Sequence, residues 1–394
     1  VYTRFQQRAN DEQKGRFGHF VDVNRDWLDD FSLFMALKGH FEKPWNEWPD
    51  DIRRRDRGAL EHWYRELDYE VWTHRLLQYL FWQQWSELKR YASSKQIGIV
   101  GDIPIFVAYD SADVWANPEL FYLDDAGSLT VVAGVPPDYF SETGQRWGNP
   151  LYRWDRLEEH SFDWWVRRMR TVFTLVDVGR LDHFRGFEAY WEIPAHEPTA
   201  VNGRWVRAPG ERLLETLRER LGNLPIIAED LGVITDEVEA LRKQFEFPGM
   251  RVLQFAFDGD PTNTHLPHNY RVNTVVYTGT HDNDTTRGWW STLDKDAQYE
   301  VLRYLGRHHL PPLRITPQLL RQAMRSVAAV AIVPMQDVLN LGSEARMNRP
   351  GAASGNWTWR FQHRDLTGHL SRWLYEMTKL YGRLPERNFK WVRP

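Results

Sequence analysis

The chain has 394 residues, of which 42% are hydrophobic and 26% charged, and its formal net charge is -4. The near-neutral charge gives no electrostatic reason to expect nucleic acid or an anionic membrane as a partner. No apolar run approaches the roughly 18 residues of a membrane-spanning helix. The absence of cysteine excludes disulfides, thiolate nucleophiles and thiolate metal sites. We expect a globular, cytoplasmic protein.

Aromatic residues are abundant, with 20 Trp, 16 Tyr and 20 Phe. Most of them should fill cores, since large apolar rings dominate buried packing. Flat rings with polar edges also suit the faces of sugars. Aromatic residues gathered in loops near acidic side chains would therefore indicate a carbohydrate site.

Residues 1–95 are predicted to form a mainly helical subdomain. Apolar residues recur at helical spacing in 26–38 and again in 61–91. In the second stretch the residues that step by three or four are Leu77, Phe81, Trp85, Leu88 and Tyr91. The Trp-rich segment 44–49 is bounded by prolines and should be irregular.

From residue 97 onward, apolar runs end in polar residues and are followed by helix-like stretches. Six runs show this pattern, at 97–107, 171–178, 224–232, 251–258, 274–284 and 330–337. Strands that alternate with helices predict an α/β fold with a parallel sheet, here in residues 96–394. A closed barrel of this kind has eight strands. Six runs therefore leave two readings open, a doubly wound open sheet or a barrel without its first two units.

Asp182 is the first candidate for chemistry, because functional groups gather at the carboxyl ends of parallel strands. Arg180 stands two residues earlier, so a strand places both side chains on one face. A cation there favours the ionised acid and lowers its pKa. The pair suits a nucleophile facing a sugar, and it equally suits a structural ion pair.

In three of the other runs the predicted strand ends at an acidic residue. Glycoside chemistry needs a second carboxyl group that donates a proton. Glu229 suits this role, since the apolar run before it should raise its pKa by desolvation. His281 and Asp282 are placed to bind sugar hydroxyls and hold a distorted ring. Asp102 is expected to support the site rather than to react.

The connection at 108–155 is far longer than a strand-to-helix loop requires, and long loops in compact domains are usually functional or disordered. This one is too aromatic for disorder. Tyr139, Phe140 and Trp147 are candidates for stacking on sugar rings, and Gln145 for binding hydroxyls. A lid that merely covers the sheet is the alternative.

A catalytic metal is disfavoured, although His281, Asp282, Asp284, Asp182 and His183 offer imidazole and carboxylate ligands. Asp182 and His183 are adjacent and would point to opposite faces of a strand. No compact ligand spacing and no glycine-rich phosphate loop is present. We expect no metal and no organic cofactor.

Several ordered motifs resemble the amylomaltases, or disproportionating enzymes, which are the 4-α-glucanotransferases of glycoside hydrolase family 77. The motifs are Gly101–Val107, Gly134–Pro150, Arg180–Phe187, Ala228–Gly232, Thr278–Asp284 and Gly342–Asn348. The resemblance extends over essentially the whole chain. It implies a (β/α)8 barrel of the TIM type and the α-amylase clan, with helical insertions.

The resemblance also assigns roles. It implies a retaining mechanism in which Asp182 is the nucleophile, Glu229 the acid/base and Asp282 the transition-state stabiliser. Three residues would support or bind the sugar: Arg180, His281 and Asn348. The acceptor side would be lined by Trp147 and Gln145, and the lip crossed by a glucan chain would be formed by Tyr139 and Phe140. The family uses no cofactor.

The departure from the family lies at the start of the chain. Family members carry about a hundred residues before the equivalent of Val1, including the first two barrel strands. We therefore expect the 394-residue chain to fold poorly by itself.

The expected partners are maltooligosaccharides, amylose or glycogen-derived glucans, with neither nucleic acid nor membrane, and the protein is expected to be a monomer or a weak homo-oligomer. A starch hydrolase of the same barrel class is the nearest alternative, because it shares nucleophile and acid. The aromatic loop favours transfer, since it would exclude water. A non-catalytic glucan-binding protein would not need three acids at strand ends.

Overall fold

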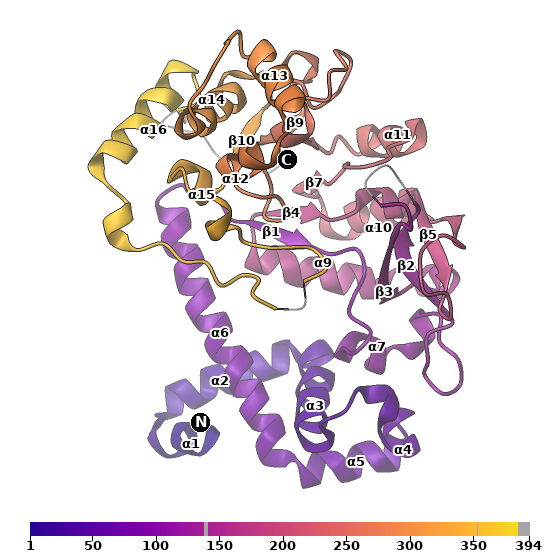
Figure 1. Ribbon diagram of the computed structural model, residues 1–394. Coiled ribbons are helices and arrows are strands. Elements are labelled where there is room, and N and C mark those ends of the chain that lie inside the picture. Colours follow the sequence, from indigo (N-terminus) through magenta and orange to yellow (C-terminus); the bar gives the residue numbers. More distant parts are fainter. Residues whose placement is uncertain (138–140, 353, 385–394) are drawn as a thin grey trace. The chain divides into compact units, whose positions relative to one another are not determined.

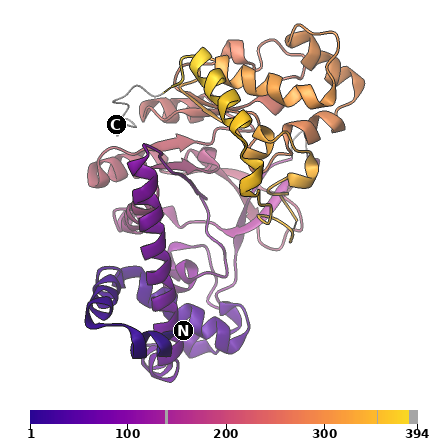
Figure 2. The same cartoon turned by 90° about the vertical axis from the view of Figure 1, so that its left-hand side faces the viewer.

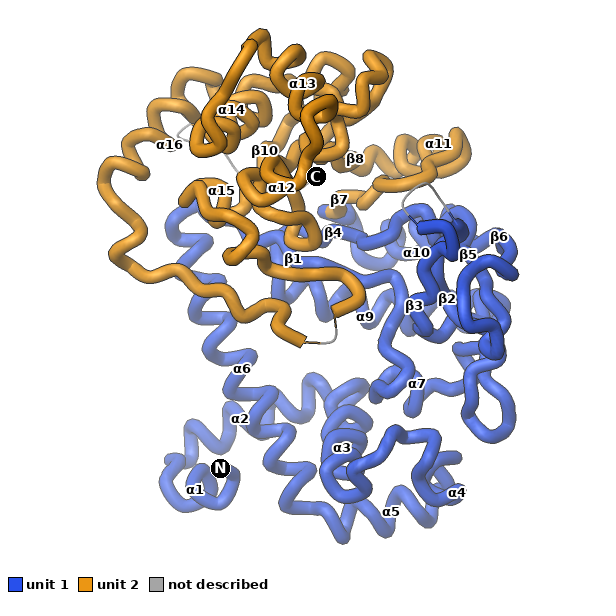
Figure 3. Tube along the Cα trace, viewed as in Figure 1, with its two compact units in different colours: residues 1–225, 394 blue, residues 226–393 orange. Residues whose placement is uncertain are grey.

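The structure is a computed structural model that describes residues 1–137, 141–352 and 354–384. The chain divides into two compact units, which we call unit 1 (Val1–Pro225) and unit 2 (Ile226–Arg393) (Figure 3). The predicted boundary between residues 95 and 96 falls inside unit 1. The division into a helical subdomain and a catalytic domain there stays a prediction.

The first 95 residues of unit 1 are helical, as the apolar spacing predicts (Figure 1). Their elements are α1 (Tyr2–Arg8), α2 (Asp11–Val23), α3 (Arg25–Phe41), η1 (Trp45–Glu47), α4 (Asp50–Arg53), α5 (Arg57–Glu66) and α6 (Asp68–Ser94). Helices α2, α3 and α5 pack against the long helix α6 (Figure 2). The core that joins α2, α3 and α6 contains Phe17, Phe20, Leu28, Leu76 and Tyr79. The predicted irregular segment 44–49 contains only the short 3-10 turn η1.

The face that α6 buries differs from its most regular apolar stripe. Phe81 and Leu88 belong to that stripe and are each 52% exposed. The buried positions include Leu76 and Tyr79, which contact α2 and α3. Periodicity therefore identified the helix correctly, but the neighbouring helices decide which of its faces is covered.

Two parallel strands of unit 1 carry the first predicted acids. β1 (Val100–Ile103) and β4 (Val178–Leu181) pair in register, with Asp102 opposite Arg180. Asp102 thus lies within its strand, and not at its end as predicted. Asp182 follows β4 directly, in agreement with the prediction.

The predicted strand 171–178 is wrong over most of its length. Residues 171–175 are the last turn of α9 (Asp163–Leu175), and β4 begins only at Val178. Trp165, Met169 and Phe173 recur at four-residue spacing, which is the helical period. Trp165 and Met169 are buried, so the packing of α9 through this face overrides the strand propensity of the β-branched residues in the run.

The long connection after β1 is folded, with helices and with two strands of an antiparallel sheet whose other two strands follow β4. Sequence periodicity did not reveal this sheet. Its strands lie in the order β3-β2-β5-β6. Their bounds are β2 (Val131–Val135), β3 (Gln145–Pro150), β5 (Ala189–Pro194) and β6 (Arg204–Arg207). The remaining elements of unit 1 are α7 (Ala112–Ala116), η2 (Pro118–Leu120), α8 (Trp154–Glu159), η3 (Phe184–Phe187) and α10 (Gly210–Leu221).

Unit 2 contains four parallel strands among its described residues, in the order β7-β8-β9-β10. The strands are β7 (Ile226–Ala228), β8 (Gly249–Val252), β9 (Thr274–Tyr277) and β10 (Val330–Ile332). The surrounding elements are α11 (Asp236–Gln244), η4 (Leu253–Phe255), η5 (Pro267–Asn269), α12 (Thr286–Thr292), α13 (Lys295–Tyr304), α14 (Pro312–Arg325), α15 (Met335–Val338), η6 (Ser343–Ala345), η7 (His363–Asp365) and α16 (Gly368–Leu380).

The six parallel strands of the described residues fall within or beside the six predicted runs, but each is only three or four residues long. β8 starts two residues before the predicted run 251–258. Within that run the strand ends at Val252 and is followed by the turn η4. The run at 330–337 splits into β10 and helix α15. The predicted α/β class is confirmed. In the part of the chain that the structure describes, no helix has both the length and the apolar character needed to cross a membrane.

The residue that follows Asp182 has a strained backbone and is half-buried. His183 has φ 50°, in the left-handed region that favours glycine and asparagine. Burial and the nearby Arg185 guanidinium lower the pKa of His183 from 6.5 to about 4. The imidazole is therefore neutral at pH 7.

Leu76→Ala should lower the free energy of unfolding by about 2–5 kcal/mol, because it opens a cavity in the core around α6. Leu88→Ala, on the exposed face of the same helix, should change it by no more than about 0.5 kcal/mol. Urea unfolding of the whole gene product measures both. Equal losses would show that the buried face of α6 is assigned wrongly.

Acid should destabilise the fold through His183. Its folded pKa of about 4 lies below the ordinary value of 6.5, so between these values the unfolded chain takes up a proton that the native protein does not. The free energy of unfolding is then constant above this window and falls as the pH is lowered through it.

The variant His183→Asn tolerates left-handed backbone. It should reduce the slope of the free energy of unfolding against pH in this window, by an amount that corresponds to the uptake of up to one proton. His265, whose pKa burial also lowers to about 4, should keep a similar slope in the variant. Denaturant unfolding from pH 7 to pH 4 measures both slopes, and an unchanged slope in His183→Asn would contradict the assignment.

Candidate active site

Nine of the predicted site residues lie in the described part of the chain, five in unit 1 and four in unit 2. Unit 1 holds Asp102, Gln145, Trp147, Arg180 and Asp182, and unit 2 holds Glu229, His281, Asp282 and Asn348. Tyr139 and Phe140 lie outside the described residues.

In unit 1 one guanidinium nitrogen joins two carboxylates. Arg180 Nη1 lies 3.0 Å from Asp182 Oδ1 and 2.6 Å from Asp102 Oδ1. The Arg180 side chain is 9% exposed, whereas that of Asp182 is 43% exposed. The predicted placement of Arg180 and Asp182 on one strand face is confirmed. A buried cation thus orients a solvent-accessible carboxylate and favours its ionised form.

Strand β3 brings the predicted aromatic and amide residues together. The Trp147 indole Nε1 donates to Gln145 Oε1 at 3.1 Å. The indole and the ring of His183 lie nearly perpendicular, with centroids 4.8 Å apart, and the ring centroid of Phe106 lies 6.4 Å from that of the indole. Trp147 is nevertheless 38% exposed, so part of its surface is open to a ligand. His183 was considered from the sequence only as a metal ligand, whereas here it supports this ring.

In unit 2, Glu229 directly follows the fully buried strand β7, as predicted. The Ala228 amide just before it donates to the Pro248 carbonyl at 3.0 Å. Asp230, the residue after it, has a buried carboxylate. Glu229 therefore stands between two residues whose positions are fixed by the neighbouring chain.

Asp282 is held at both its carboxylate and its backbone. Asn348 Nδ2 donates to Asp282 Oδ1 at 2.6 Å, and the Asn348 amide donates to the His281 carbonyl at 3.1 Å. Arg346 Nη2 donates to the Asp282 carbonyl at 2.6 Å. The His281 ring packs on Trp357 with centroids 5.1 Å apart. Asn348 was expected to support or bind sugar, and its contacts are those of a residue that positions Asp282.

A buried carboxylate also ties together the two ends of the loop that carries His281 and Asp282. Asp337 Oδ2 accepts from the hydroxyls of Thr278 and Thr286, each at 2.6 Å, and Asp337 Oδ1 accepts from the Thr286 amide at 2.7 Å. Burial raises the pKa of Asp337, and these three donors act against that effect. From the sequence, Asp337 is recognisable only as the end of an apolar run. Nothing in a single sequence marks its partners, which lie 51 and 59 residues away.

Among the described residues, no group of three or more His, Asp or Glu side chains is arranged to hold a metal ion. The expectation that the chemistry needs no metal stays a prediction. The contacts found are instead ion pairs and hydrogen bonds that orient carboxylates.

The chain is similar to a known protein family over most of its length. The family model described as 4-alpha-glucanotransferase matches residues 1–367. The 4-alpha-glucanotransferase of Thermus thermophilus is 54% identical over 377 residues, which cover 94% of this chain and 75% of that protein. The corresponding protein of Synechocystis is 53% identical over 387 residues, with 97% and 76% covered.

A solved structure of amylomaltase from Streptococcus agalactiae, in complex with acarbose, matches with a TM-score of 0.90 and 41% identity. The match covers 95% of this chain and 76% of that one. The TIM-type α/β fold predicted from the motifs is therefore confirmed. Because the family model and these relatives extend over nearly its whole length, the chain belongs to the 4-α-glucanotransferase family, glycoside hydrolase family 77.

Proposed function

We propose that the protein performs the 4-α-glucanotransferase reaction of its family by double displacement, with Asp182 as nucleophile, Glu229 as acid/base and Asp282 as transition-state stabiliser. The observation that carries the proposal is the Arg180–Asp182 ion pair at 3.0 Å, at the carboxyl end of β4. It supplies an oriented, ionised and accessible carboxylate at the edge where parallel strands gather chemistry.

In the first step, an Asp182 oxygen attacks the anomeric carbon of the donor glucan. The carbon–oxygen bond to the next sugar breaks, and Glu229 gives its proton to the departing oxygen. A covalent glycosyl-enzyme intermediate remains. The positive charge that develops on the sugar ring is stabilised by the Asp282 carboxylate, which Asn348 holds in place.

In the second step, Glu229 takes the proton of the 4-hydroxyl of an acceptor sugar as that oxygen attacks the anomeric carbon. The bond to Asp182 breaks and the configuration is retained. Trp147 and Gln145 are the acceptor-side residues of this proposal, since the partly exposed indole offers a face for a sugar ring. Tyr139 and Phe140 complete the proposed lip that a glucan chain crosses. Asp102 and His281 act as supports for their neighbouring carboxylates.

The proposed substrates are maltooligosaccharides, amylose and glycogen-derived glucans. The acarbose complex of the Streptococcus agalactiae amylomaltase supports an oligosaccharide in this fold. Hydrolysis would use the same first step, with water in place of the acceptor hydroxyl. The membership of the chain in a transferase family favours a sugar acceptor. The cytoplasmic location and the monomeric or weakly oligomeric state stay predictions.

The whole gene product incubated with maltotriose should produce glucose together with maltodextrins longer than the substrate. The number of reducing ends should not rise, because each bond broken is replaced by another. Chromatography and a reducing-end assay measure the two quantities. A rise in reducing ends with shorter products alone would mean that water resolves the intermediate, and a hydrolase would then be the correct assignment.

Asp182→Asn should lower turnover of maltotriose on the order of 10⁴-fold or more, because the amide is a poor nucleophile while the fold is kept. Asp155→Asn, which removes an exposed carboxylate from α8 of the same unit, is the matched control and should keep wild-type turnover. A glucan-binding protein without catalysis would show no turnover, and neither substitution would change its affinity for glucan.

A further inference from the structure

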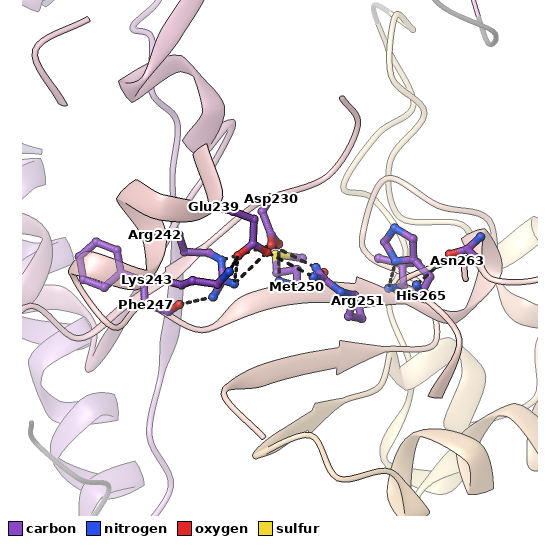
Figure 4. Close-up of polar contacts among 10 residues, drawn as sticks. Asp230, Glu239, Arg242, Lys243, Phe247, Met250, Arg251, Asn263 and His265 are labelled. Atoms are coloured by element: carbon purple, nitrogen blue, oxygen red, sulfur yellow. Dashed lines mark hydrogen bonds and ion pairs between the residues drawn. The ribbon is translucent and has the colours of Figure 1, made fainter. Parts of the chain in front are cut away.

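The residue after the proposed acid/base makes an unusually complete set of contacts. Asp230 Oδ1 accepts from the Met250 amide at 2.6 Å, and Asp230 Oδ2 accepts from Arg251 Nη1 at 3.1 Å (Figure 4). Arg242 Nε of helix α11 lies 3.5 Å from the same Oδ2. The Asp230 side chain is 2% exposed. One buried carboxylate thus joins the end of β7 to β8 and α11.

Gly249 leaves the space that this carboxylate occupies. A Cβ atom on Gly249 would lie 2.4 Å from Asp230 Oδ2, closer than side chains approach one another. Gly249 pairs with Ala228, the last residue of β7. Since its backbone is not in the left-handed region, the side-chain clash is the constraint at this position.

The charges around Asp230 are paired in a network of two acids and three bases. Glu239 binds Arg242 at 3.0 Å and Lys243 at 2.9 Å, and lies 4.0 Å from Arg251 (Figure 4). Burial raises the pKa of Asp230, whereas Arg251 and the Met250 amide lower it. A carboxylate in this place costs desolvation that only well-placed donors offset.

The arginines are themselves held by the backbone. Arg242 Nη1 donates to the Phe247 carbonyl at 2.7 Å, and Arg251 Nη1 donates to the Met250 carbonyl at 2.6 Å (Figure 4). Beyond Arg251, the Val252 amide donates to His265 Nδ1 at 3.0 Å. The partners of Asp230 are therefore fixed in position independently of Asp230.

We propose that Asp230 is the positioning residue for Glu229, acting by locking the backbone on which the acid/base stands to β8 and α11. The inference rests on the proposed function, because it takes Glu229 as the group that moves the proton. Glu229 lies between the Ala228 amide, bound to Pro248, and the Asp230 carboxylate, bound to Met250 and the two arginines. Both neighbours of Glu229 are thus tied to the start of β8.

Proton transfer requires the acid within hydrogen-bond reach of the leaving oxygen. A displacement near 1 Å can lower a rate by roughly 100-fold. Loosening Asp230 should therefore weaken the step that needs a proton and spare a step that does not. This selectivity distinguishes a positioning role from a loss of folded protein, which lowers every activity alike.

The test compares two reactions of the whole gene product. With maltotriose, Glu229 must protonate the departing oxygen and later deprotonate the acceptor. With α-maltotriosyl fluoride and azide, fluoride leaves with the electron pair of the carbon–fluorine bond and needs no proton. Azide then forms the carbon–nitrogen bond as the bond to Asp182 breaks, and no base is needed. The second reaction therefore reports the nucleophile without the acid/base.

Asp230→Asn should lower kcat for maltotriose by about 10- to 100-fold, while the fluoride–azide rate stays within about threefold of wild type. Gly249→Ala should give the same pattern without removing a charge, since its Cβ displaces the carboxylate. Rates are expressed per folded molecule, with the folded fraction taken from near-UV circular dichroism. A variant that folds poorly then does not mimic a catalytic loss.

Matched controls exist in unit 2. Asp236→Asn removes an exposed carboxylate from the start of α11, and Gly368→Ala adds a Cβ that would lie 3.8 Å from its nearest neighbour, Arg372 Nη1. Both should keep wild-type rates in both reactions. Asp337→Asn loosens the loop that carries Asp282 instead, and should lower the two rates together.

Glu229→Gln separates failure of this inference from failure of the proposed function. If Glu229→Gln lowers both reactions equally, the acid/base assignment is wrong and the inference falls with it. If Glu229→Gln is selective for maltotriose while Asp230→Asn and Gly249→Ala are not, the acid/base stands and Asp230 has a structural role alone.

Discussion

Buried carboxylates surrounded by hydrogen-bond donors are the constraint on which the arrangement of unit 2 depends. Asp230 ties the end of β7 to β8 and α11, and Asp337 ties both ends of the loop after β9 to each other. An ionised group in such a place is costly unless every donor is correctly placed, so alternative loop conformations that leave it unpaired are strongly disfavoured. The fold thus obtains rigid strand ends from residues that take no part in the proposed chemistry.

The residues proposed to react have the opposite character. The side chains of Asp182 and Asp282 are 43% and 42% exposed, and each contacts a well-placed donor, Arg180 for the first and Asn348 for the second. A nucleophile or a transition-state stabiliser must be reachable by the sugar, so it cannot be satisfied from all sides by the protein. The group that orients the carboxylate therefore has to contact it from the protein side, as the Arg180 guanidinium and the Asn348 amide do.

The sequence alone predicted the parts of this arrangement that depend on local spacing. The two-residue period of a strand was enough to place Arg180 and Asp182 together, and the apolar runs located the six parallel strands of the described residues to within a few residues. It did not locate strand ends well, as β1 and β8 show, because in short buried strands the neighbouring elements decide where pairing stops.

Non-local packing accounts for what the sequence did not show. The run 171–178 is rich in β-branched residues, yet most of it belongs to α9, because its aromatic and apolar residues upstream pack as one helical face. The antiparallel sheet of β2, β3, β5 and β6 is formed by segments separated by the parallel strand β4. No periodicity within the connection 108–155 contains the information that β2 pairs with β5.

The same reasoning explains why the sequence indicated a role for Glu229 and Asp282 but none for Asp230 and Asp337. All four stand near the ends of apolar runs, so position alone cannot divide them into groups that react and groups that hold. What divides them is burial and the number of donors, and both are properties of chain segments far away in sequence. At the end of β7 the two adjacent acids therefore divide into one less buried group, Glu229, and one buried anchor, Asp230. The partners of the second member decide how firmly the first is held.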